Sequence, residues 1–346
     1  MRKKDIIFKQ LCECAPWIVR FALFKMPSIE KLHHRDIDEQ AARLTGYDQS
    51  YQQISRGSFS GTFTSCTVDQ ELSLFFEKTN QVLYVNAMVP RDYYAIGLLM
   101  NADRTLVLNC EPFPKGAAFI LPPGSELEGI SSPDMRFCIV HVSCDLLKRV
   151  LEHQYQELDL FGSDYLQYMR IHGKQDTRPL FSLLEDFQTG ADKAHLSLEN
   201  ANQLAALKNS LLDTICSVFI SNSEPGRLKR GMTTRNKHHR LFHDALDIIR
   251  NNICEELTVG KLCEELTASR RTLEYVFNEN IKMSPAKYIR ALRLNNIRRE
   301  ILSKERDTLG DIAARWGIWH LGHFSRDYYQ LFGELPSVTK GSAARR

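Results

Sequence analysis

The sequence predicts two domains: a β-rich N-terminal domain with helices, and an all-α C-terminal domain of two helix-turn-helix units joined by a long helix. Three observations predict this architecture. A chain of 346 residues can bury two separate cores. Short β-branched and aromatic runs fill residues 55–145, and a helical pattern repeats after residue 238. We expect the domains to span residues 1–220 and 238–340, with a linker over residues 221–237.

The β-rich segment consists of short runs separated by turn-like stretches. Runs such as FSGTFTSC, LSLFFE, VLYVNAMV and FCIVHVS recur at regular spacing, with the turn LPPGSELEG at 121–129 between two of them. This spacing predicts a sandwich or a small, cupin-like barrel. Such a barrel either encloses one small ligand or fills its interior with side chains, and the sequence allows both. Residues 146–220 are predicted to be helical.

Charge is distributed unevenly along the chain. Residues 227–346 contain 23 Lys and Arg against 14 Asp and Glu, a net charge of +9. Residues 1–226 contain 22 against 28, a net charge of −6. A basic C-terminal third favours an anionic partner for that part alone, although a solvated basic face would give the same count. The stretch 221–237 is rich in Ser, Gly, Pro, Asn and basic residues, which is typical of an exposed linker.

The composition favours a cytoplasmic protein. The apolar run APWIVRFALF near the N-terminus is interrupted by charged residues and lacks a small-residue cleavage site, so we do not expect export. No segment reaches the roughly 18 apolar residues that a membrane span needs. The nine cysteines are scattered and odd in number, which is typical of small core residues in a reducing compartment.

An internal repeat marks the C-terminal domain. Residues 258–285 align with residues 308–336, in which each copy consists of a short helix, a turn and a second helix. This is the order of a helix-turn-helix unit. The positions that recur fifty residues later are Thr258, Gly260, Leu262 and Leu266, which become Thr308, Gly310, Ile312 and Trp316.

The second helix of the first unit is predicted to begin after a Ser269 cap and to bury one apolar stripe. That stripe consists of Leu273, Val276 and Phe277, which leaves Arg270, Arg271, Glu274 and Tyr275 facing out. Arginine is well suited to guanine, whose O6 and N7 both accept hydrogen bonds, while tyrosine and glutamate can contact phosphate and cytosine. The exposed face therefore predicts contact with DNA bases.

The second helix of the second unit has a comparable pattern. Its predicted buried stripe is Leu321, Phe324, Tyr328 and Leu331, which leaves Gly322, His323 and Arg326 facing out. We expect Gly317 to form the turn, Gly322 to permit a close backbone approach, and Gly333 with Pro336 to end the helix.

Between the two units, Ser284–Leu302 is predicted to be a long capped helix that holds them at a fixed separation. For two recognition helices in successive major grooves, that separation is about 34 Å, one turn of DNA. Several basic side chains on or near this helix are candidates for phosphate contacts: Arg270, Arg290, Arg293 and Arg298.

On these residues, the segment 238–337 resembles the DNA-binding domain of AraC/XylS-type bacterial transcription regulators, including the Gly333–Pro336 segment after the second unit. The resemblance implies a sequence-specific, effector-responsive activator. It implies a sensor or dimerisation domain at the N-terminus, and double-stranded DNA, RNA polymerase and a second copy of the chain as partners. It assigns base reading to Arg271, Glu274 and Tyr275 in the first unit and to Gly322, His323 and Arg326 in the second.

Three positions depart from the family pattern. Thr267 stands where the first turn commonly has glycine, Ile318 stands where phenylalanine is usual, and Gly322 has no side chain with which to read a base. The strings SRRTLEYVF, RLNNIRREIL and GIWHLGHFSRDYYQLF are similar to the ethanolamine-utilisation regulator branch. That narrower resemblance implies a response to ethanolamine with adenosylcobalamin.

Other classes of function have weaker support. The histidine pairs His239 and His243, and His320 and His323, have spacings that suit a metal, but no Cys or acidic ligand completes either set, so we expect no metal. The barrel shows neither a phosphate loop nor a nucleophile elbow, so we do not expect an enzyme. A non-specific nucleic-acid-binding protein would also use a basic domain, but it would not require duplicated, capped helices.

Overall fold

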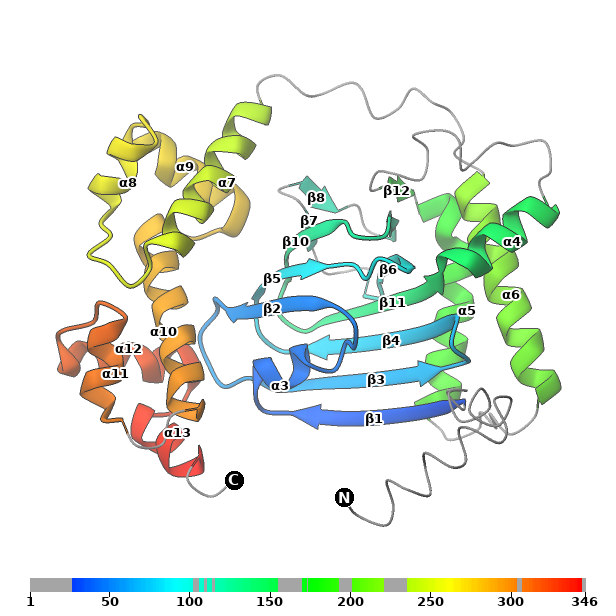
Figure 1. The fold of residues 1–346 in the computed structure, drawn as a ribbon, viewed down its shortest axis with the longest axis horizontal. Helices are drawn as coiled ribbons and strands as arrows, with labels where there is room; N and C mark the ends of the chain where they lie inside the picture. Colours follow the sequence, from blue (N-terminus) through cyan, green and yellow to red (C-terminus); the bar gives the residue numbers. More distant parts are fainter. Residues whose placement is uncertain are drawn as a thin grey trace, which may run out of the picture.

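The N-terminal part of the chain forms two antiparallel sheets (Figure 1). The computed structural model describes residues 27–101, 106–108, 111–113, 116–154, 170–172, 174–192, 201–220, 235–303 and 307–343. The first sheet contains, in spatial order, β1 (Ser28–His34), β3 (Gly61–Thr67), β4 (Leu72–Thr79), β11 (Met135–Ser143), β6 (Tyr93–Leu99), β9 (Ala118–Leu121) and β12 (Arg170–His172). The second contains β2 (Asp48–Gln53), β5 (Leu83–Met88), β10 (Glu126–Ile130), β7 (Leu106–Leu108) and β8 (Glu111–Phe113).

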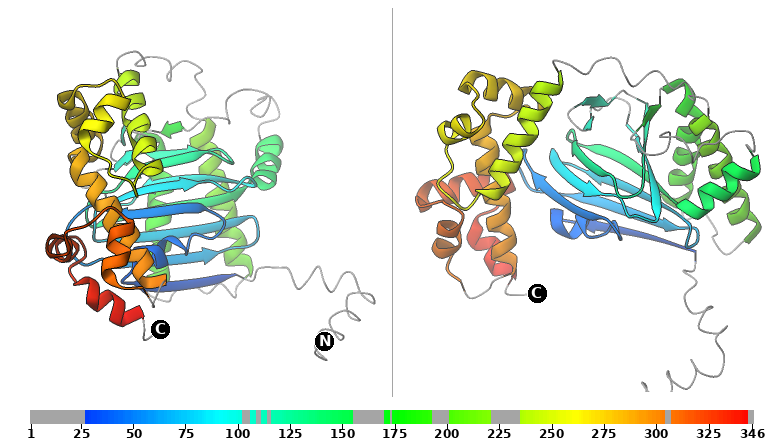
Figure 2. Two further views of the ribbon diagram at one scale, coloured as in Figure 1. Left: turned by 60° about the vertical axis from the view of Figure 1, so that its left-hand side comes forward. Right: turned by 45° about the horizontal axis from the view of Figure 1, so that its top comes forward.

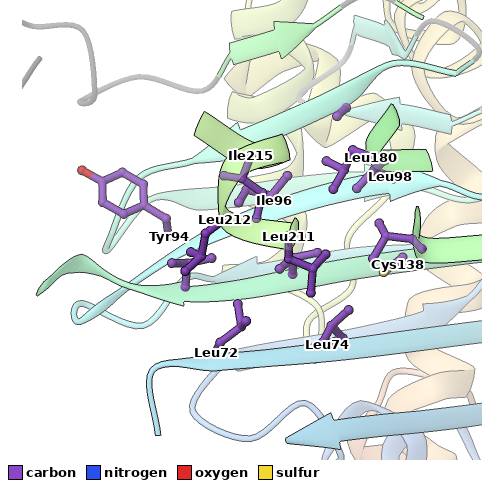
Figure 3. Packing of buried hydrophobic residues seen from close by; sticks show 14 of the residues in the cluster. Leu72, Leu74, Tyr94, Ile96, Leu98, Cys138, Leu180, Leu211, Leu212 and Ile215 are labelled. Carbon is purple, nitrogen blue, oxygen red and sulfur yellow. The ribbon is translucent and has the colours of Figure 1, made fainter. Parts of the chain in front are cut away.

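Alternating side chains give the first sheet two buried faces. On β11, Cys138 and Val140 face a helical layer, while Phe137 and Ile139 face the second sheet. The helical layer consists of α4 (Cys144–Gln154), α5 (Lys174–Asp192) and α6 (Ala201–Ile220). Figure 3 shows its leucine and isoleucine side chains packed on those of β4, β6 and β11.

The core between the sheets needs space for aromatic rings. Gly97 on β6 is paired in register with Phe119 on β9. A Cβ atom at Gly97 would lie 2.1 Å from the Phe119 ring, so the glycine leaves the room that the ring occupies. A short helix, α3 (Ile37–Ala41), lies beside β2 and completes this part of the fold (Figure 1).

The β structure begins earlier than the predicted segment 55–145, because β1 and β2 both precede residue 55. Their sequences, SIEKLHH and DQSYQQ, are mostly polar. Both are edge strands, so each has one neighbour and few apolar side chains to signal a strand.

Seven helices form the described C-terminal part: α7 (Arg235–Asn251), α8 (Val259–Glu265), α9 (Arg270–Ile281), α10 (Pro285–Ser303), α11 (Leu309–Arg315), α12 (Leu321–Phe332) and α13 (Pro336–Ala343). They enclose two apolar cores. The 19-residue helix α10 contributes to both, since Tyr288 and Leu292 belong to the first core and Ile297 and Ile301 to the second. A helix that is buried on two sides has no single apolar stripe, which explains why α10 lacks clear amphipathic periodicity.

The C-terminal helices pack on the outer face of the second sheet. Ile54, which directly follows β2, and Tyr84 on β5 belong to the same core as α7, α9 and α10. Arg250 on α7 donates to the Tyr84 hydroxyl at 2.5 Å and to Glu128 at 3.0 Å. Figure 2 shows the resulting order of layers, from α4–α6 through the two sheets to the C-terminal helices. None of the described helices is long and apolar enough to cross a membrane.

Candidate nucleic-acid interface

The first helix-turn-helix unit has a side-chain cap at the start of each helix. The Thr258 hydroxyl accepts from the Lys261 amide at 3.2 Å, and the Ser269 hydroxyl accepts from the Thr272 amide at 3.1 Å. The predicted Ser269 cap is therefore confirmed. Thr267 adopts φ = 49°, the left-handed conformation that a turn glycine would take without strain. The turn therefore keeps its backbone path despite the β-branched residue.

The outward face of α9 has the composition that the sequence predicts. Leu273, Val276 and Phe277 are fully buried, and the four polar positions on the opposite face are exposed. Arg270 Nε donates to Glu274 at 3.0 Å, so this arginine, and not Arg271, forms the ion pair along the helix. Within the described residues, Arg271 has no ion-pair partner, which leaves its guanidinium available to a ligand.

Tyr275 lies next to Glu274 on the outward face of α9. Its side chain is 52% exposed, and its ring packs edge-on against His238 of α7 at a centroid distance of 5.5 Å. That contact orients the ring while it leaves the side chain accessible.

The second unit has a different chemistry at the start of its recognition helix. Thr308 caps α11 by accepting from the Asp311 amide at 3.1 Å, and Gly317 forms the turn with φ = 68°. His320 precedes α12 without a side-chain capping bond. Ile318, which replaces the usual phenylalanine, is buried in the second core. The turn is therefore held by apolar packing and by the glycine.

Two predictions about α12 are wrong. Leu321 is 50% exposed and does not belong to the buried stripe, because the first residue of the helix lies beyond the edge of the core. Pro336 does not end α12; the helix ends at Phe332 with Gly333 at φ = 74°, and Pro336 is the first residue of α13. Phe324 and Tyr328 are buried as predicted.

The outward face of α12 combines polar and apolar groups. Gly322, His323 and Arg326 are exposed, and an Arg326 nitrogen lies 2.9 Å from His323 Nδ1. A Cβ atom at Gly322 would meet no atom of another described segment within 4 Å, so the surface at this glycine is open. Trp319 is 73% exposed just before this helix. Sequence reasoning placed the aromatic residues of this stretch in the core, and for Trp319 that prediction is wrong.

The four candidate phosphate-contacting arginines are not equivalent. Arg270 and Arg290 are exposed, although Arg270 pairs with Glu274 and Arg290 pairs with Asp327. Arg293 donates to the Ile253 and Glu255 carbonyl oxygens at 3.0 and 2.6 Å, and burial lowers its pKa. Through these hydrogen bonds, Arg293 holds the segment before α8 against α10.

Arg298 is not available to a phosphate in this conformation. Its side chain is 14% exposed, and its guanidinium contacts Asp36, at 3.4 Å, and Glu334. Burial lowers the pKa of Arg298, but Tyr328 and the two carboxylates outweigh this effect and raise it above the ordinary value. The sequence prediction is wrong here because a helix pattern does not show that another domain covers the position.

A groove of about 330 Å³ lies between the two units. It is bounded by the start of α8, by α10 and by the turn before α12. The polar side chains that line it are Thr258, Arg290, Arg293, His320 and His323. Basic and neutral donors therefore surround a hollow beside the start of α12, a chemistry suited to an anionic backbone.

The described residues contain no group of three or more His, Cys, Asp or Glu side chains that could hold a metal. The His320 and His323 rings are 6.5 Å apart between centroids and meet edge to face. The other predicted pair cannot be compared in this way, since the His239 side chain lies outside the described residues.

Residues 262–342 match a family model described as a helix-turn-helix domain. Relatives include the probable thc operon regulatory protein of Rhodococcus erythropolis, which is 30% identical over 95 residues. The XylDLEGF operon transcriptional activator of Pseudomonas putida is 30% identical over 100 residues. These matches cover 27% and 28% of this chain, and 29% and 31% of the relatives, so the chain spans less than a third of the length of either.

Two solved structures are also similar. The AraC-like transcriptional activator CuxR aligns over 83% of this chain and 100% of its own, with 16% identity and a TM-score of 0.41. A probable AraC family transcriptional regulator from Rhodopseudomonas palustris aligns over 30% of this chain and 97% of its own, with 29% identity and a TM-score of 0.28. The family model covers α9 to α12, in which the two predicted recognition helices lie. Residues 262–342 of this chain therefore carry a helix-turn-helix domain.

Proposed function

We propose that this protein is a transcription regulator that binds a specific DNA duplex through α9 and α12 and activates a neighbouring operon. The observation that carries the proposal is the position of the two outward faces. Both remain exposed while the second sheet packs on α7, α10 and the end of α12. The conformation therefore leaves both recognition helices accessible to a duplex.

The two helices would read DNA by different chemistry. On α9, the exposed Arg271 guanidinium suits the O6 and N7 acceptors of guanine, with Glu274 and Tyr275 beside it. On α12, Gly322 offers no side chain, and His323 and Arg326 remain as polar candidates. Exposed Trp319 and Leu321 add an apolar surface that suits the thymine methyl group.

Helix α10 would set the distance between the two recognition helices, α9 and α12. Its 19 residues span about 28 Å at 1.5 Å per residue, and its side chains belong to the cores of both units. Packing on both sides prevents the units from moving independently. We propose that this spacing places α9 and α12 in successive major grooves.

The decisive experiment is genome-wide mapping of the DNA bound by the full-length protein, followed by titration of the recovered site. Specific binding predicts one recurrent site that survives a large excess of competitor DNA. Uniform binding without a recurrent site would instead indicate a non-specific nucleic-acid-binding protein. The genes beside the mapped site would identify the pathway.

The remaining parts of the proposal concern partners. A cytoplasmic activator of this kind would contact RNA polymerase and act as a homodimer. Ethanolamine with adenosylcobalamin is the effector pair that the narrower resemblance implies. A thermal-shift measurement with each compound, alone and together, tests that pair; an unchanged Tm in all three cases would remove it.

A further inference from the structure

A single carboxylate lies in the apolar space between the two sheets. Along β4, Leu74 and Phe76 face the helical layer, whereas Phe75 and Glu77 face the second sheet. In register, Glu77 lies opposite Phe63 on one side and Phe137 on the other. Glu77 is partly buried among these rings, and an ionisable group is costly to withdraw from water.

The hydrogen bonds of Glu77 are both to neutral groups. Gln40 Nε2 donates to one carboxylate oxygen at 2.7 Å, and the Tyr51 hydroxyl donates to the other at 2.9 Å. No basic side chain of the described residues pairs with Glu77. Burial raises the pKa of Glu77, and the two hydrogen bonds oppose that rise. The site therefore supplies hydrogen bonds for the carboxylate but no positive charge.

A cavity of about 60 Å³ adjoins this carboxylate. Its wall is almost entirely aliphatic and aromatic, with side chains such as Val85, Ala87, Leu108 and Phe119. Among the few polar groups that line it are Glu77, Tyr51 and Tyr47. The Tyr47 hydroxyl is buried and makes no hydrogen bond within the described residues. A polar atom left unpaired beside a cavity indicates a missing partner.

We propose that this cavity is a binding site for a small molecule with an apolar body and a cationic amine head, and that the amine pairs with Glu77. The apolar wall takes the body, and the carboxylate supplies the opposite charge. The Tyr47 hydroxyl provides a second hydrogen bond near the head. A carboxylic acid is disfavoured because it would place a second negative charge beside Glu77.

The same site is connected to the C-terminal domain. The two groups that hold Glu77 come from α3 and β2, and both elements are held in turn by α10. Arg299 Nε donates to Asp38 of α3 at 2.9 Å, and another Arg299 nitrogen donates to the Tyr51 carbonyl oxygen. An amine that draws Glu77 away from Tyr51 and Gln40 therefore loosens the elements on which α10 rests. This regulatory part rests on the function proposed above, whereas the binding site itself does not.

The test uses full-length protein and three probes of equal chain length: butylamine, 1-butanol and butyrate. Their heads are cationic, neutral and anionic near neutral pH. We expect butylamine to raise Tm by about 3 °C at tenfold its Kd, 1-butanol to raise it less, and butyrate to leave it unchanged. In Glu77→Gln the advantage of the amine over the alcohol should disappear. Glu152→Gln, at an exposed carboxylate on α4, is the matched control and should behave as wild type.

Equal shifts with all three probes, no shift with any, or an amine advantage that persists in Glu77→Gln would each overturn the proposal. If Glu77→Gln does not fold, Ala87→Leu serves instead, because it fills the cavity and leaves the carboxylate in place. This variant should lose the butylamine shift.

A separate titration measures the Kd for the mapped DNA site with and without butylamine. We expect at least a twofold change in wild type and none in Glu77→Gln. Stabilisation without that change would overturn the link to α10 alone. Failure to bind any specific DNA would instead remove the proposed function and leave the amine site standing.

Discussion

Asn295 forms two hydrogen bonds with the main chain of Gln53 across the contact between the two domains. The Gln53 amide donates to Asn295 Oδ1 at 3.0 Å, and Asn295 Nδ2 donates to the Gln53 carbonyl oxygen at 3.0 Å. Because β2 is an edge strand, the side chain of α10 takes the place of a missing strand neighbour. Asn295 is only 1% exposed, so water cannot replace it.

Asn295→Ala should therefore leave a buried donor and a buried acceptor without partners. We expect the free energy of unfolding to fall by about 2–4 kcal/mol. Urea denaturation followed by circular dichroism measures this change. Asn278→Ala, at an exposed position on α9, is the control and should change stability by less than about 0.5 kcal/mol. Similar losses in the two variants would contradict the assigned role of Asn295.

The two turns should respond to substitution in opposite directions. Thr267→Gly removes a β-branched residue from φ = 49° and should stabilise the protein by about 1 kcal/mol. Gly317→Ala should destabilise it by at least about 1 kcal/mol, because φ is 68° and the new Cβ would lie 3.3 Å from the Arg293 guanidinium. Thermal denaturation of the two variants checks both signs. A loss of stability in Thr267→Gly would show that the threonine makes compensating contacts.

Arg271 and Arg326 should differ in their effects on DNA binding. Arg271→Ala should cost about 1–3 kcal/mol at the mapped site and relax preference at one base pair. Arg326 Nε lies 3.9 Å from an Asp327 carboxylate oxygen, and the guanidinium lies beside His323. The alternative to a base contact for Arg326 is a contact with a phosphate. In that case Arg326→Ala weakens all sequences alike. Titration against single-base variants of the site distinguishes these results, and unchanged binding in both variants would remove the recognition-helix assignment.

Salt dependence should separate exposed arginines from buried ones. Each neutralised phosphate contributes about 0.9 to the slope of log K against log salt concentration. Arg290→Ala should lower that slope by about one, since Arg290 is 47% exposed on α10. Arg298→Ala should leave the slope unchanged and should instead reduce stability by about 3–5 kcal/mol, because it leaves Asp36 buried without its partner. A reduced slope in Arg298→Ala would show that the guanidinium reaches DNA after all.

Stability should depend on pH through Glu77. Burial raises its pKa in the folded protein above the ordinary value of 4.5, so the folded state binds more protons than the unfolded state just above that pH. Wild-type stability should therefore fall as the pH rises through 4.5 and on through the raised pKa. Glu77→Gln lacks this titration, so its free energy of unfolding should rise relative to that of wild type over the same pH range. Urea titrations at several pH values measure it, and parallel curves would contradict the prediction.

Local signals account for what the sequence predicts correctly in the C-terminal part. The Ser269 cap, the buried stripe of α9 and the turn at Gly317 depend on residues within one or two helical turns. The internal repeat adds a second copy of the same evidence. Most of the architecture of the two units could therefore be predicted without knowledge of the rest of the chain.

Long-range contacts account for what the sequence does not predict. Arg298 has the spacing of an exposed basic residue, yet Asp36, from a strand-to-helix turn 262 positions earlier, covers it. Glu77 appears in a run of apolar residues whose alternation is clear only once the strand faces are known. The surroundings of neither residue can be recognised from its neighbours in the sequence. They depend on packing within one domain for Glu77 and between two domains for Arg298.

Gly333 shows how closely the two parts of the chain are fitted together. It ends α12 in the left-handed conformation, and a Cβ atom there would lie 2.8 Å from the Ser58 amide nitrogen of the N-terminal domain. Any side chain compatible with the helix end would still collide with the neighbouring domain. The helix-turn-helix part of the chain is therefore not freely exchangeable between proteins. In a chimera that joins this part to a different N-terminal domain, the new domain must have a concave surface at Gly333. Without one, the two domains will not pack together.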